Sequence, residues 1–308
     1  MSLAAAGAVL LAGGLDRLVG EPPERLHPVA LFGSVVARVD RAWPRPWLTG
    51  GLVALMLPLA AAVAVAAPVA LAARVAPAAA VPLAALALFA TTSLRLLLQE
   101  ARAVLQLVDT DLSAARDRLR SLAGRDSSDL NAGLVRSAAV ESAAENLADG
   151  LVAPLSAFAL AAPFGLAAAA GAAAWVKAVN TLDSMLGYPA KSHGTASARL
   201  DDAVMWIPAR LSALALALAA AKPMAALRAR AWTDRVPSPN SGWPMGVAAA
   251  AVGARLEKPG VYVLNDAAGL PGSTAASQAV DVVARAGLLA WAVAAAGLAI
   301  PALAGVVA

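Results

Sequence analysis

Charge and cysteine are both scarce in this chain of 308 residues. Only 14% of the residues are Asp, Glu, Lys or Arg, against about 25% in ordinary soluble domains, and 60% are hydrophobic. This balance predicts an integral membrane protein whose first partner is the lipid bilayer. Cysteine is absent, which excludes disulfides and thiolate metal ligands.

Familiar nucleotide and hydrolase motifs are also missing. The chain has no G-x-x-x-x-G-K-[ST], no G-x-G-x-x-G and no H-E-x-x-H, and G-x-S-x-G does not occur in a nucleophile-elbow setting. A nucleotide, if used, must therefore be held by Mg²⁺ on carboxylates and by scattered Arg and Lys. Because the net charge of +4 includes no run of basic residues, we expect no nucleic-acid partner.

Long uncharged windows predict the membrane helices. A helix needs about 20 apolar residues to cross the hydrocarbon core, and residues 50–73, 75–94, 151–176 and 286–308 meet this length. A weaker window, 203–221, is interrupted by Arg210. Residues 1–15 are uncharged but lack the basic start of a signal peptide, so they predict a short first membrane helix. The expected fold is an all-α polytopic bundle with about five transmembrane helices.

The distribution of basic residues predicts the topology. Arg74 and Pro77 suggest a tight hairpin, which places loops 16–47 and 95–150 on one side with 5 and 7 basic residues. Residues 222–285 add 7 more. The positive-inside rule makes this side cytoplasmic, in a cell membrane.

The polar segment 177–202 then falls outside, unless the preceding window 151–176 is re-entrant. The helix breakers in that window are Pro154, Pro163, Gly165 and Gly171. If they divide the window, each half is too short to span the membrane. The sequence leaves both topologies open.

Residues 95–150 are expected to form a helical cytoplasmic insertion within a single membrane-embedded catalytic domain, 1–308. Residues 96–122 have apolar positions at helical spacing, which predicts one helix ended by Gly124. The stretch 127–131 offers a cap for the next helix. No segment alternates convincingly as a strand.

That next helix carries an acidic row. Glu141, Glu145 and Asp149 recur every four residues after Ser137, and Ser142 with Asn146 forms a second polar row. Carboxylates that share one face repel one another unless a metal ion, a cationic substrate or a basic partner neutralises them. The alternative is a solvated acidic helix end.

Two further polar blocks lie at the ends of apolar windows. In residues 15–29, prolines make a stiff segment that could fix Asp16, Arg17, Glu21 and His27. A lone histidine such as His27 is, however, more often a hydrogen-bonded structural group than a ligand. In residues 177–188, Lys177, Asn180 and Ser184 share a helical face with Asp183 beside them. Lys177 could instead extend only to the membrane interface.

The last blocks are 197–202 and 236–245, followed by 256–262. Arg199 can reach Asp202 as a surface pair, which leaves Asp201 to spare. Asn240 and Ser241 lie in a segment rich in Pro and Gly, where a rigid binding loop and an ordinary connector are equally plausible.

Together these blocks resemble the CobD/CbiB family of adenosylcobinamide-phosphate synthases. The matching sequences are L-D-R-L-V-G-E-P-P with H-P-V, G-R-D-S, V-E-S-A-A-E-N-L-A-D-G-L-V-A-P-L, K-A-V-N-T-L-D-S-M-L-G-Y, S-A-R-L-D-D with I-P-A-R-L, and S-P-N-S-G-W-P-M. They cover residues 15 to about 265. The chain departs from the family pattern in the short stretch P-A-K-S-H-G-T-A and at Met245, where Glu is common.

The resemblance implies a membrane ligase that uses ATP to join adenosylcobyric acid to (R)-1-aminopropan-2-ol or its O-phosphate. Such chemistry needs Mg²⁺ and cations around the transferring phosphoryl group, and a base for the ammonium nucleophile. We assign Glu141, Glu145 and Asp149 to Mg²⁺ or the amine, with Asp183, Asp201 and Asp202 as alternatives. Lys177 and Arg199 would face phosphate. The expected substrate-binding residues are Asp16, His27, Asn146, Asn180, Ser184, Asp201, Asp202, Asn240 and Ser241.

Two other functions fit parts of the sequence. Broken helices with intramembrane acids are also typical of transporters, so a corrinoid or small-molecule carrier is an alternative. A non-catalytic scaffold is a third, but it gives no reason for Asn, Asp and Glu at fixed spacing. A homo-oligomer is compatible with all three.

Overall fold

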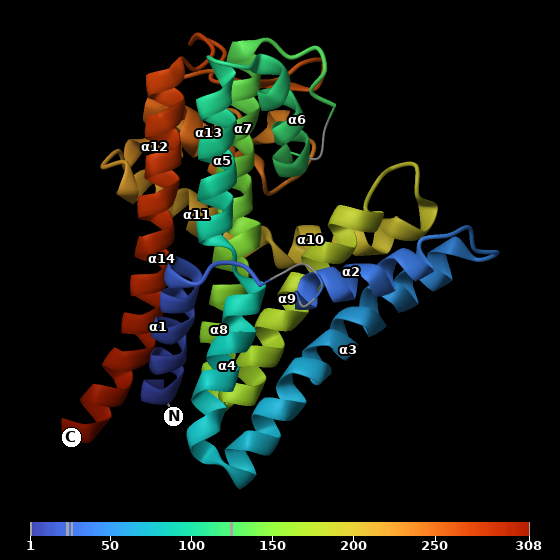
Figure 1. Ribbon diagram of the computed structural model, residues 1–308, viewed down its shortest axis with the longest axis vertical. Coiled ribbons are helices and arrows are strands. Elements are labelled where there is room, and N and C mark those ends of the chain that lie inside the picture. The colour runs from blue at the N-terminus through green and yellow to red at the C-terminus, as the bar shows by residue number, and fades with distance from the viewer. Residues whose placement is uncertain (1, 23–24, 26, 124–125, 308) are drawn as a thin grey trace. The chain divides into compact units, whose positions relative to one another are not determined.

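The computed structural model describes residues 2–22, 25, 27–123 and 126–307, and it is almost entirely helical (Figure 1). Its helices are long and rich in alanine, a residue that favours helix and lets helix backbones approach closely. Four helical segments in the described part of the chain are long and apolar enough to cross a membrane, or five if the pair of helices interrupted at Met205 counts as one. The expectation of an all-α polytopic membrane protein is confirmed.

The chain divides into two compact units. The first comprises residues 1–93, 149–205 and 291–308, and the second comprises 94–148 and 206–290. The second unit therefore combines the predicted insertion with a later part of the chain.

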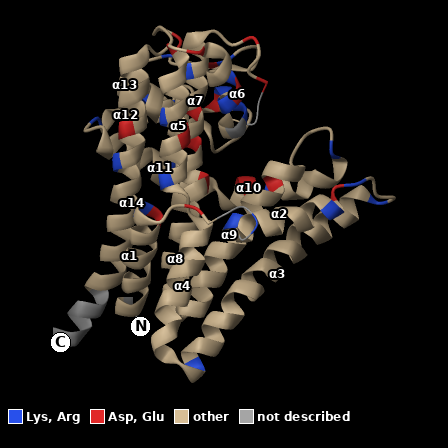
Figure 2. Ribbon diagram, viewed as in Figure 1, with Lys and Arg blue, Asp and Glu red and all other residues tan. Residues whose placement is uncertain are grey.

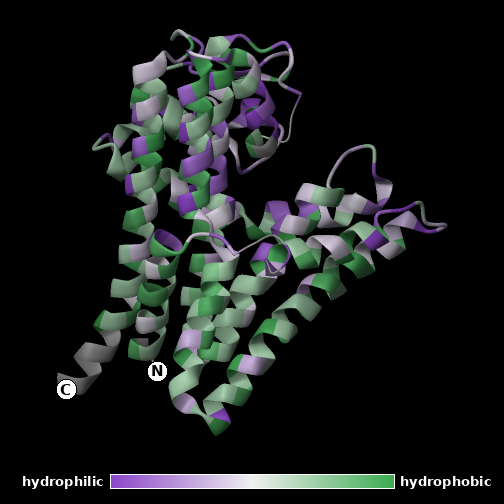
Figure 3. Ribbon diagram, viewed as in Figure 1, coloured by the Kyte–Doolittle hydropathy of each residue, from purple (hydrophilic) through white to green (hydrophobic). Residues whose placement is uncertain are grey.

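Helices α3 (Pro46–Val75) and α4 (Pro77–Thr91) of the first unit form the predicted hairpin, because only Ala76 separates them. Each begins with a proline, which a first helical turn tolerates since its amide has no partner there. Figure 3 shows that both are hydrophobic along most of their length. Helix α1 (Ser2–Leu18) has 17 residues and is not among the candidate spans, so the predicted first membrane helix is a helix of marginal length.

The window 151–176 is broken, as its prolines and glycines predict. A π-helical turn, η2 (Ala148–Val152), leads into α8 (Ala153–Ala161) and the short turn η3 (Ala162–Phe164). Gly165 then has φ +111°, and α9 (Leu166–Leu186) begins and packs beside α8. The window is thus a helical hairpin that turns at Gly165.

Two of the four predicted breakers do not interrupt a helix. Pro154 lies in the first turn of α8, and Gly171 lies inside α9. A Cβ on Gly171 would meet Ala66 Cβ at 3.1 Å and the Ala62 carbonyl oxygen at 3.2 Å. Gly171 is therefore a site of close approach between α9 and α3, which sequence reasoning took for a break.

The first unit is completed by α2 (Pro28–Val39) and α10 (Thr195–Val204), both of which pack on α9. Val36 of α2 and Leu182 and Leu186 of α9 form a buried apolar cluster. In the weaker window 203–221, α10 ends at Val204, and α11 (Trp206–Ala219), which belongs to the second unit, carries Arg210 within its length.

In the second unit, three helices share one apolar core. They are α5 (Leu94–Val108), α6 (Leu112–Ala123) and α7 (Ala132–Leu147). The core residues are Val104, Val108, Ala115, Leu119, Val135, Ala138 and Ala139.

The prediction of one helix over 96–122 was wrong. The turn at 109–111 separates α5 from α6, and the Asp111 carboxylate accepts a hydrogen bond from the Ala114 amide. The predicted cap of α7 is confirmed, since Asn131 Oδ1 accepts from the Leu134 amide at 3.0 Å. Gly124, expected to end the helix, lies outside the described residues.

The rest of the second unit contains α12 (Met224–Ala229), α13 (Gly242–Val252), the two strands β1 (Leu256–Lys258) and β2 (Tyr262–Leu264), and the first part of α14 (Ser273–Val307). The strands form an antiparallel hairpin in which Glu257 pairs with Val263. Sequence reasoning missed this hairpin because three residues per strand are too few for a visible alternation.

Candidate functional site

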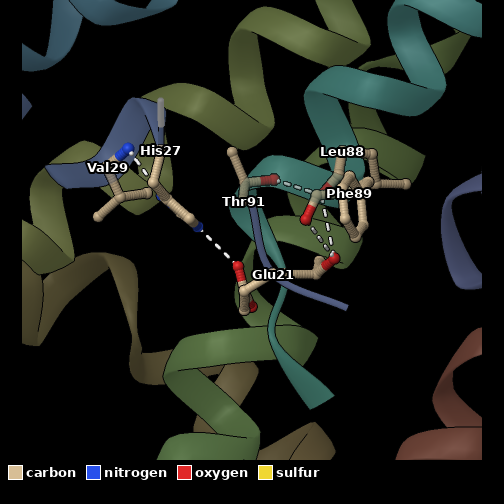
Figure 4. A network of polar contacts seen from close by, with 7 residues as sticks. Glu21, His27, Val29, Leu88, Phe89 and Thr91 are labelled. Atoms are coloured by element: carbon tan, nitrogen blue, oxygen red, sulfur yellow. Dashed lines mark hydrogen bonds and ion pairs between the residues drawn. The ribbon is translucent and has the colours of Figure 1, made fainter. Parts of the chain in front are cut away.

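His27 and Glu21 form a fixed pair in the first unit. The His27 side chain caps α2, with Nδ1 accepting a hydrogen bond from the Val29 amide at 3.2 Å (Figure 4). Nε2 points toward Glu21 and lies 2.6 Å from Glu21 Oε2. Both ring nitrogens are therefore engaged, which is what we expect if His27 is a hydrogen-bonded structural group.

In the same segment Asp16 is buried, while Pro23, Glu24 and Leu26 lie outside the described residues.

Figure 4 also shows the end of α4 near this pair. The Thr91 hydroxyl donates to the Leu88 carbonyl at 2.8 Å, in the last turn of α4. The Thr92 hydroxyl donates to the Leu88 carbonyl at 3.0 Å and to the Phe89 carbonyl at 3.2 Å.

Asp149 lies in the π-helical turn η2. The wider turn is held on one side by the Ser93 amide, which donates to the Gly150 carbonyl at 3.0 Å. Asp149 accepts a hydrogen bond from the Asn180 side chain and interacts electrostatically with Lys177. Such π turns are often found at functional sites.

Three further aspartates of the same unit are linked to Asp149 and Asn180. Asp201 and Asp183 act on Asp149 as like charges, and Asp202 acts on Asp183 in the same way. Asn180 also donates to Asp201 Oδ1 at 3.5 Å, a long hydrogen bond. We refer to Asp149, Lys177, Asn180, Asp183, Asp201 and Asp202 as the Asp149 cluster.

The Asp149 cluster has more acidic than basic side chains, because its six residues include four aspartates and one lysine, and Lys177 interacts with Asp149 among them. Lys177 also interacts electrostatically with Glu21, which connects the cluster to the His27 pair. Half-buried carboxylates of this kind favour a bound cation, since the cation relieves their mutual repulsion.

Asp183 owes part of its placement to Gly187. A Cβ on Gly187 would lie 1.9 Å from Asp183 Oδ1, so only glycine leaves room for the carboxylate over the end of α9. Two predicted residues lie toward solvent instead. Arg199 is exposed on α10, and the exposed Ser184 donates its hydroxyl to the Asn180 carbonyl at 2.9 Å.

Glu141 has quite different surroundings in the second unit. It is buried, and its two carboxylate oxygens accept hydrogen bonds from Ser137 Oγ at 2.6 Å and from the Tyr262 hydroxyl at 2.7 Å. Ser137 Oγ in turn accepts from the Glu257 amide at 2.7 Å. These bonds hold the β1–β2 hairpin on α7 and give Glu141 a structural role. Sequence reasoning had noted residues 256–262 but did not connect Tyr262 with Glu141.

The other predicted residues of the second unit lie apart from these bonds. The Asn146 side chain donates to the Ser142 carbonyl at 2.9 Å, and Glu145 is half-buried on α7. Asn240 and Ser241 are buried, and Asn240 Oδ1 lies 3.4 Å from Arg210 Nη1.

Arg210 itself stacks on two tryptophans. Its guanidinium lies 4.0 Å from the ring centre of Trp206 and 5.2 Å from that of Trp243. This stacking fixes the arginine beside Asn240.

The predicted metal ligands Glu141, Glu145 and Asp149 divide between the two units, and the π turn changes the helical period between Glu145 and Asp149. Across the described residues, no group of three or more His, Asp or Glu side chains is arranged to hold a metal ion. The assignment of these three to Mg²⁺ stays a prediction.

Comparison with known proteins decides the family. The family model described as CobD/Cbib protein matches residues 9–300. The chain belongs to the CobD/CbiB family.

Curated CobD relatives agree over most of both chains. A probable cobalamin biosynthesis protein CobD of Methanothrix thermoacetophila is 37% identical over 296 residues, covering 92% of this chain and 93% of the relative. Cobalamin biosynthesis proteins CobD of Dehalococcoides mccartyi and Rhodobacter capsulatus are 36% and 35% identical, with 83% of this chain covered in each case and 85% and 83% of the relatives. No solved structure matches this CobD/CbiB chain.

Proposed function

We propose that this chain is a biosynthetic enzyme of the cobalamin pathway that forms an amide bond between adenosylcobyric acid and (R)-1-aminopropan-2-ol or its O-phosphate, driven by ATP hydrolysis. Family membership supports the pathway. The Asp149 cluster supports the chemistry, because amide formation from a carboxylate needs groups for a cationic amine, for phosphate and for proton removal.

The side chains of the cluster suit these three tasks. The aspartates attract the substrate ammonium and orient it, and Lys177 attracts phosphate oxygens. A carboxylate of the cluster takes the proton that the amine releases on attack. We assign the base to the cluster and not to His27, since both nitrogens of His27 are engaged by Glu21 and the Val29 amide.

Mg²⁺ fits the donor chemistry of the cluster. This ion prefers carboxylate oxygens and is commonly held by one or two carboxylates together with substrate phosphates, so a protein group of three ligands is not required. Asp149 and Asp201, which act on each other as like charges, are the residues that would hold it. When bound, it would supply charge neutralisation at the transferring phosphoryl group.

The decisive assay uses the purified full-length protein in detergent, with adenosylcobyric acid, aminopropanol phosphate, ATP and Mg²⁺, and detects the amide by mass spectrometry. We expect product only when all components are present. Replacing aminopropanol phosphate by free aminopropanol identifies the preferred nucleophile. Corrinoid accumulation in proteoliposomes without any amide product would contradict the proposal and support a carrier.

Two variants test the cluster. Asp149→Asn and Lys177→Ala each remove a charge and should lower the rate by about 100-fold or more, as loss of a preorganised charged contact does in other active sites. Asp281→Asn is the matched control, because Asp281 is exposed in the second unit and pairs with Arg102 at 3.1 Å. Normal rates for both cluster variants, with unchanged elution on size-exclusion chromatography, would refute the assignment.

A further inference from the structure

The turn that joins α2 to α3 carries three arginines in eight residues. Arg38, Arg41 and Arg45 are all exposed, and none forms an ion pair with any residue that the structure describes. Figure 2 shows basic residues gathered where α2 ends and α3 begins. We refer to residues 38–48 as the α2–α3 turn.

The one carboxylate of the α2–α3 turn is already neutralised. Asp40 Oδ2 lies 2.6 Å from Lys191 Nζ, and Asp40 Oδ1 lies 3.2 Å from His193 Nε2. Lys191 also donates to the Met185 carbonyl at 2.8 Å. Because Asp40 is held by these two residues, it does not cancel the charge of the three arginines.

Aromatic side chains accompany the arginines. The Arg41 guanidinium lies 4.2 Å from the ring centre of Trp43, and Trp43 Nε1 donates to the Val39 carbonyl at 2.9 Å. Trp47 and Leu48, in the first turn of α3, are 66% and 57% exposed. Tryptophan with a polar neighbour on one side and apolar surface on the other is typical of the level of the lipid headgroups.

The helix that follows fixes the depth of the α2–α3 turn. Helix α3 has the highest hydropathy of the candidate spans, and only 17% of its most apolar window is buried against the protein. Much of that window is therefore exposed or partly exposed, and its apolar surface can contact lipid tails. Helix α3 begins at Pro46, so the three arginines lie just before the point where this helix enters the apolar layer of the membrane.

We infer that the α2–α3 turn is a binding surface for anionic phospholipid headgroups, with Arg38, Arg41 and Arg45 on the lipid phosphates and Trp47 at the boundary with the acyl chains. A guanidinium donates two parallel hydrogen bonds to a phosphate, which makes arginine suited to this contact. The surface anchors the start of α3 at one membrane face.

Native mass spectrometry of the full-length protein in detergent tests this surface directly. The protein is mixed with equal amounts of phosphatidylglycerol and phosphatidylcholine, and bound lipids are counted. We expect phosphatidylglycerol to bind at least about tenfold more tightly, since each arginine near an anionic surface contributes on the order of fivefold in affinity. Inorganic phosphate, added at millimolar concentration, should not displace it.

The variant Arg38→Gln/Arg41→Gln/Arg45→Gln should lose most of this preference, which is a fall of about tenfold or more in its affinity for phosphatidylglycerol. The matched control is Arg74→Gln/Arg228→Gln/Arg230→Gln, which removes the same charge from other exposed positions. We expect the control to bind phosphatidylglycerol as the natural chain does.

Three outcomes would overturn the inference: equal binding of the two lipids, unchanged affinity in the α2–α3 turn variant, or equal losses in both triple variants, which would show attraction by net charge alone. Displacement of phosphatidylglycerol by inorganic phosphate would also contradict the inference, because it would show that the arginines bind a free anion and not a lipid headgroup. If the triple variant does not fold, the single variants Arg41→Gln and Trp47→Ala should each weaken phosphatidylglycerol binding severalfold.

Discussion

At the scale of single residues, Glu141 and Asp149 belong to one acidic row in the sequence but have different surroundings. Hydrogen bonds from Ser137 and Tyr262 occupy Glu141, whereas Asp149 lies among other aspartates beside Lys177. A buried carboxylate that has lost a donor is costly, while a repelled carboxylate gains from a cation. We therefore expect Glu141 to contribute mainly to the fold, and we propose Asp149 as the residue that contacts a cation or the substrate amine.

The Glu141 network predicts a stability effect. Tyr262→Phe removes the donor to Glu141 Oε2 and should lower the free energy of unfolding by about 1–3 kcal/mol. Tyr188→Phe is the matched control, because the chain has only two tyrosines and Tyr188 is exposed. Thermal unfolding in detergent measures both, and equal midpoints for the two variants would argue against a structural role for Glu141.

Asp40 predicts a pH dependence. The hydrogen bond from Lys191 lowers the pKa of the Asp40 carboxyl, and His193 adds to this effect. A carboxyl with a lowered pKa in the folded state stabilises the fold above its ordinary pKa of about 4, and this contribution is lost as the pH falls through the lowered value.

Asp40→Asn should thus lower the free energy of unfolding at pH 7 by up to about 1 kcal/mol for a partly exposed pair, and with it the thermal midpoint. The difference from the natural chain should shrink as the pH falls below 4. Thermal unfolding at pH 7, 5 and 3 follows this difference, with the exposed Asp234→Asn as control. A difference that stays constant over this range would contradict the ion pair.

At the scale of helices, the close approach of α9 to α3 depends on Gly171. Gly171→Leu places a side chain where Ala66 Cβ and the Ala62 carbonyl already lie, so the two helices must separate. We expect a loss of about 1–3 kcal/mol in the free energy of unfolding, which is the usual cost of overpacking. Gly297→Leu in α14 is the control, because a Cβ there meets no atom within 4 Å. Similar unfolding midpoints for both variants would show that the α3–α9 contact is not tight.

At the scale of the whole molecule, the distribution of basic residues predicts which loops face the cytoplasm. The absence of natural cysteine makes single-cysteine labelling possible without further changes. Cysteine at Ala76 should react with a membrane-impermeant maleimide in intact cells, and cysteine at Ser113 only after permeabilisation. Both positions are exposed. The reverse pattern would invert the predicted topology.

The sequence leaves open on which side of the membrane residues 177–202 lie, and a cysteine at the exposed position Ala190 tests this. If 151–176 is re-entrant, as its hairpin at Gly165 favours, Ala190→Cys should be labelled only after permeabilisation, like the Ser113 position. Labelling in intact cells would require that 151–176 crosses the membrane.

The sequence by itself determined the membrane class, the main apolar helices, the α3–α4 hairpin and the family. These features depend on composition, on long uncharged runs and on local motifs, all of which are visible without folding. The cap of α7 at Asn131 was predictable for the same reason, because a capping side chain and its amide are three residues apart.

Only the tertiary structure decided which polar residues lie together. Asp149, Asn180 and Asp201 come from three separate elements, and Tyr262 reaches Glu141 from 121 positions along the chain. The regular spacing of the acidic row could not reveal the π turn, which changes the helical period before Asp149. Side chains meet through the packing of helices, and that packing depends on contacts such as Gly171 on α3 that a linear pattern does not contain.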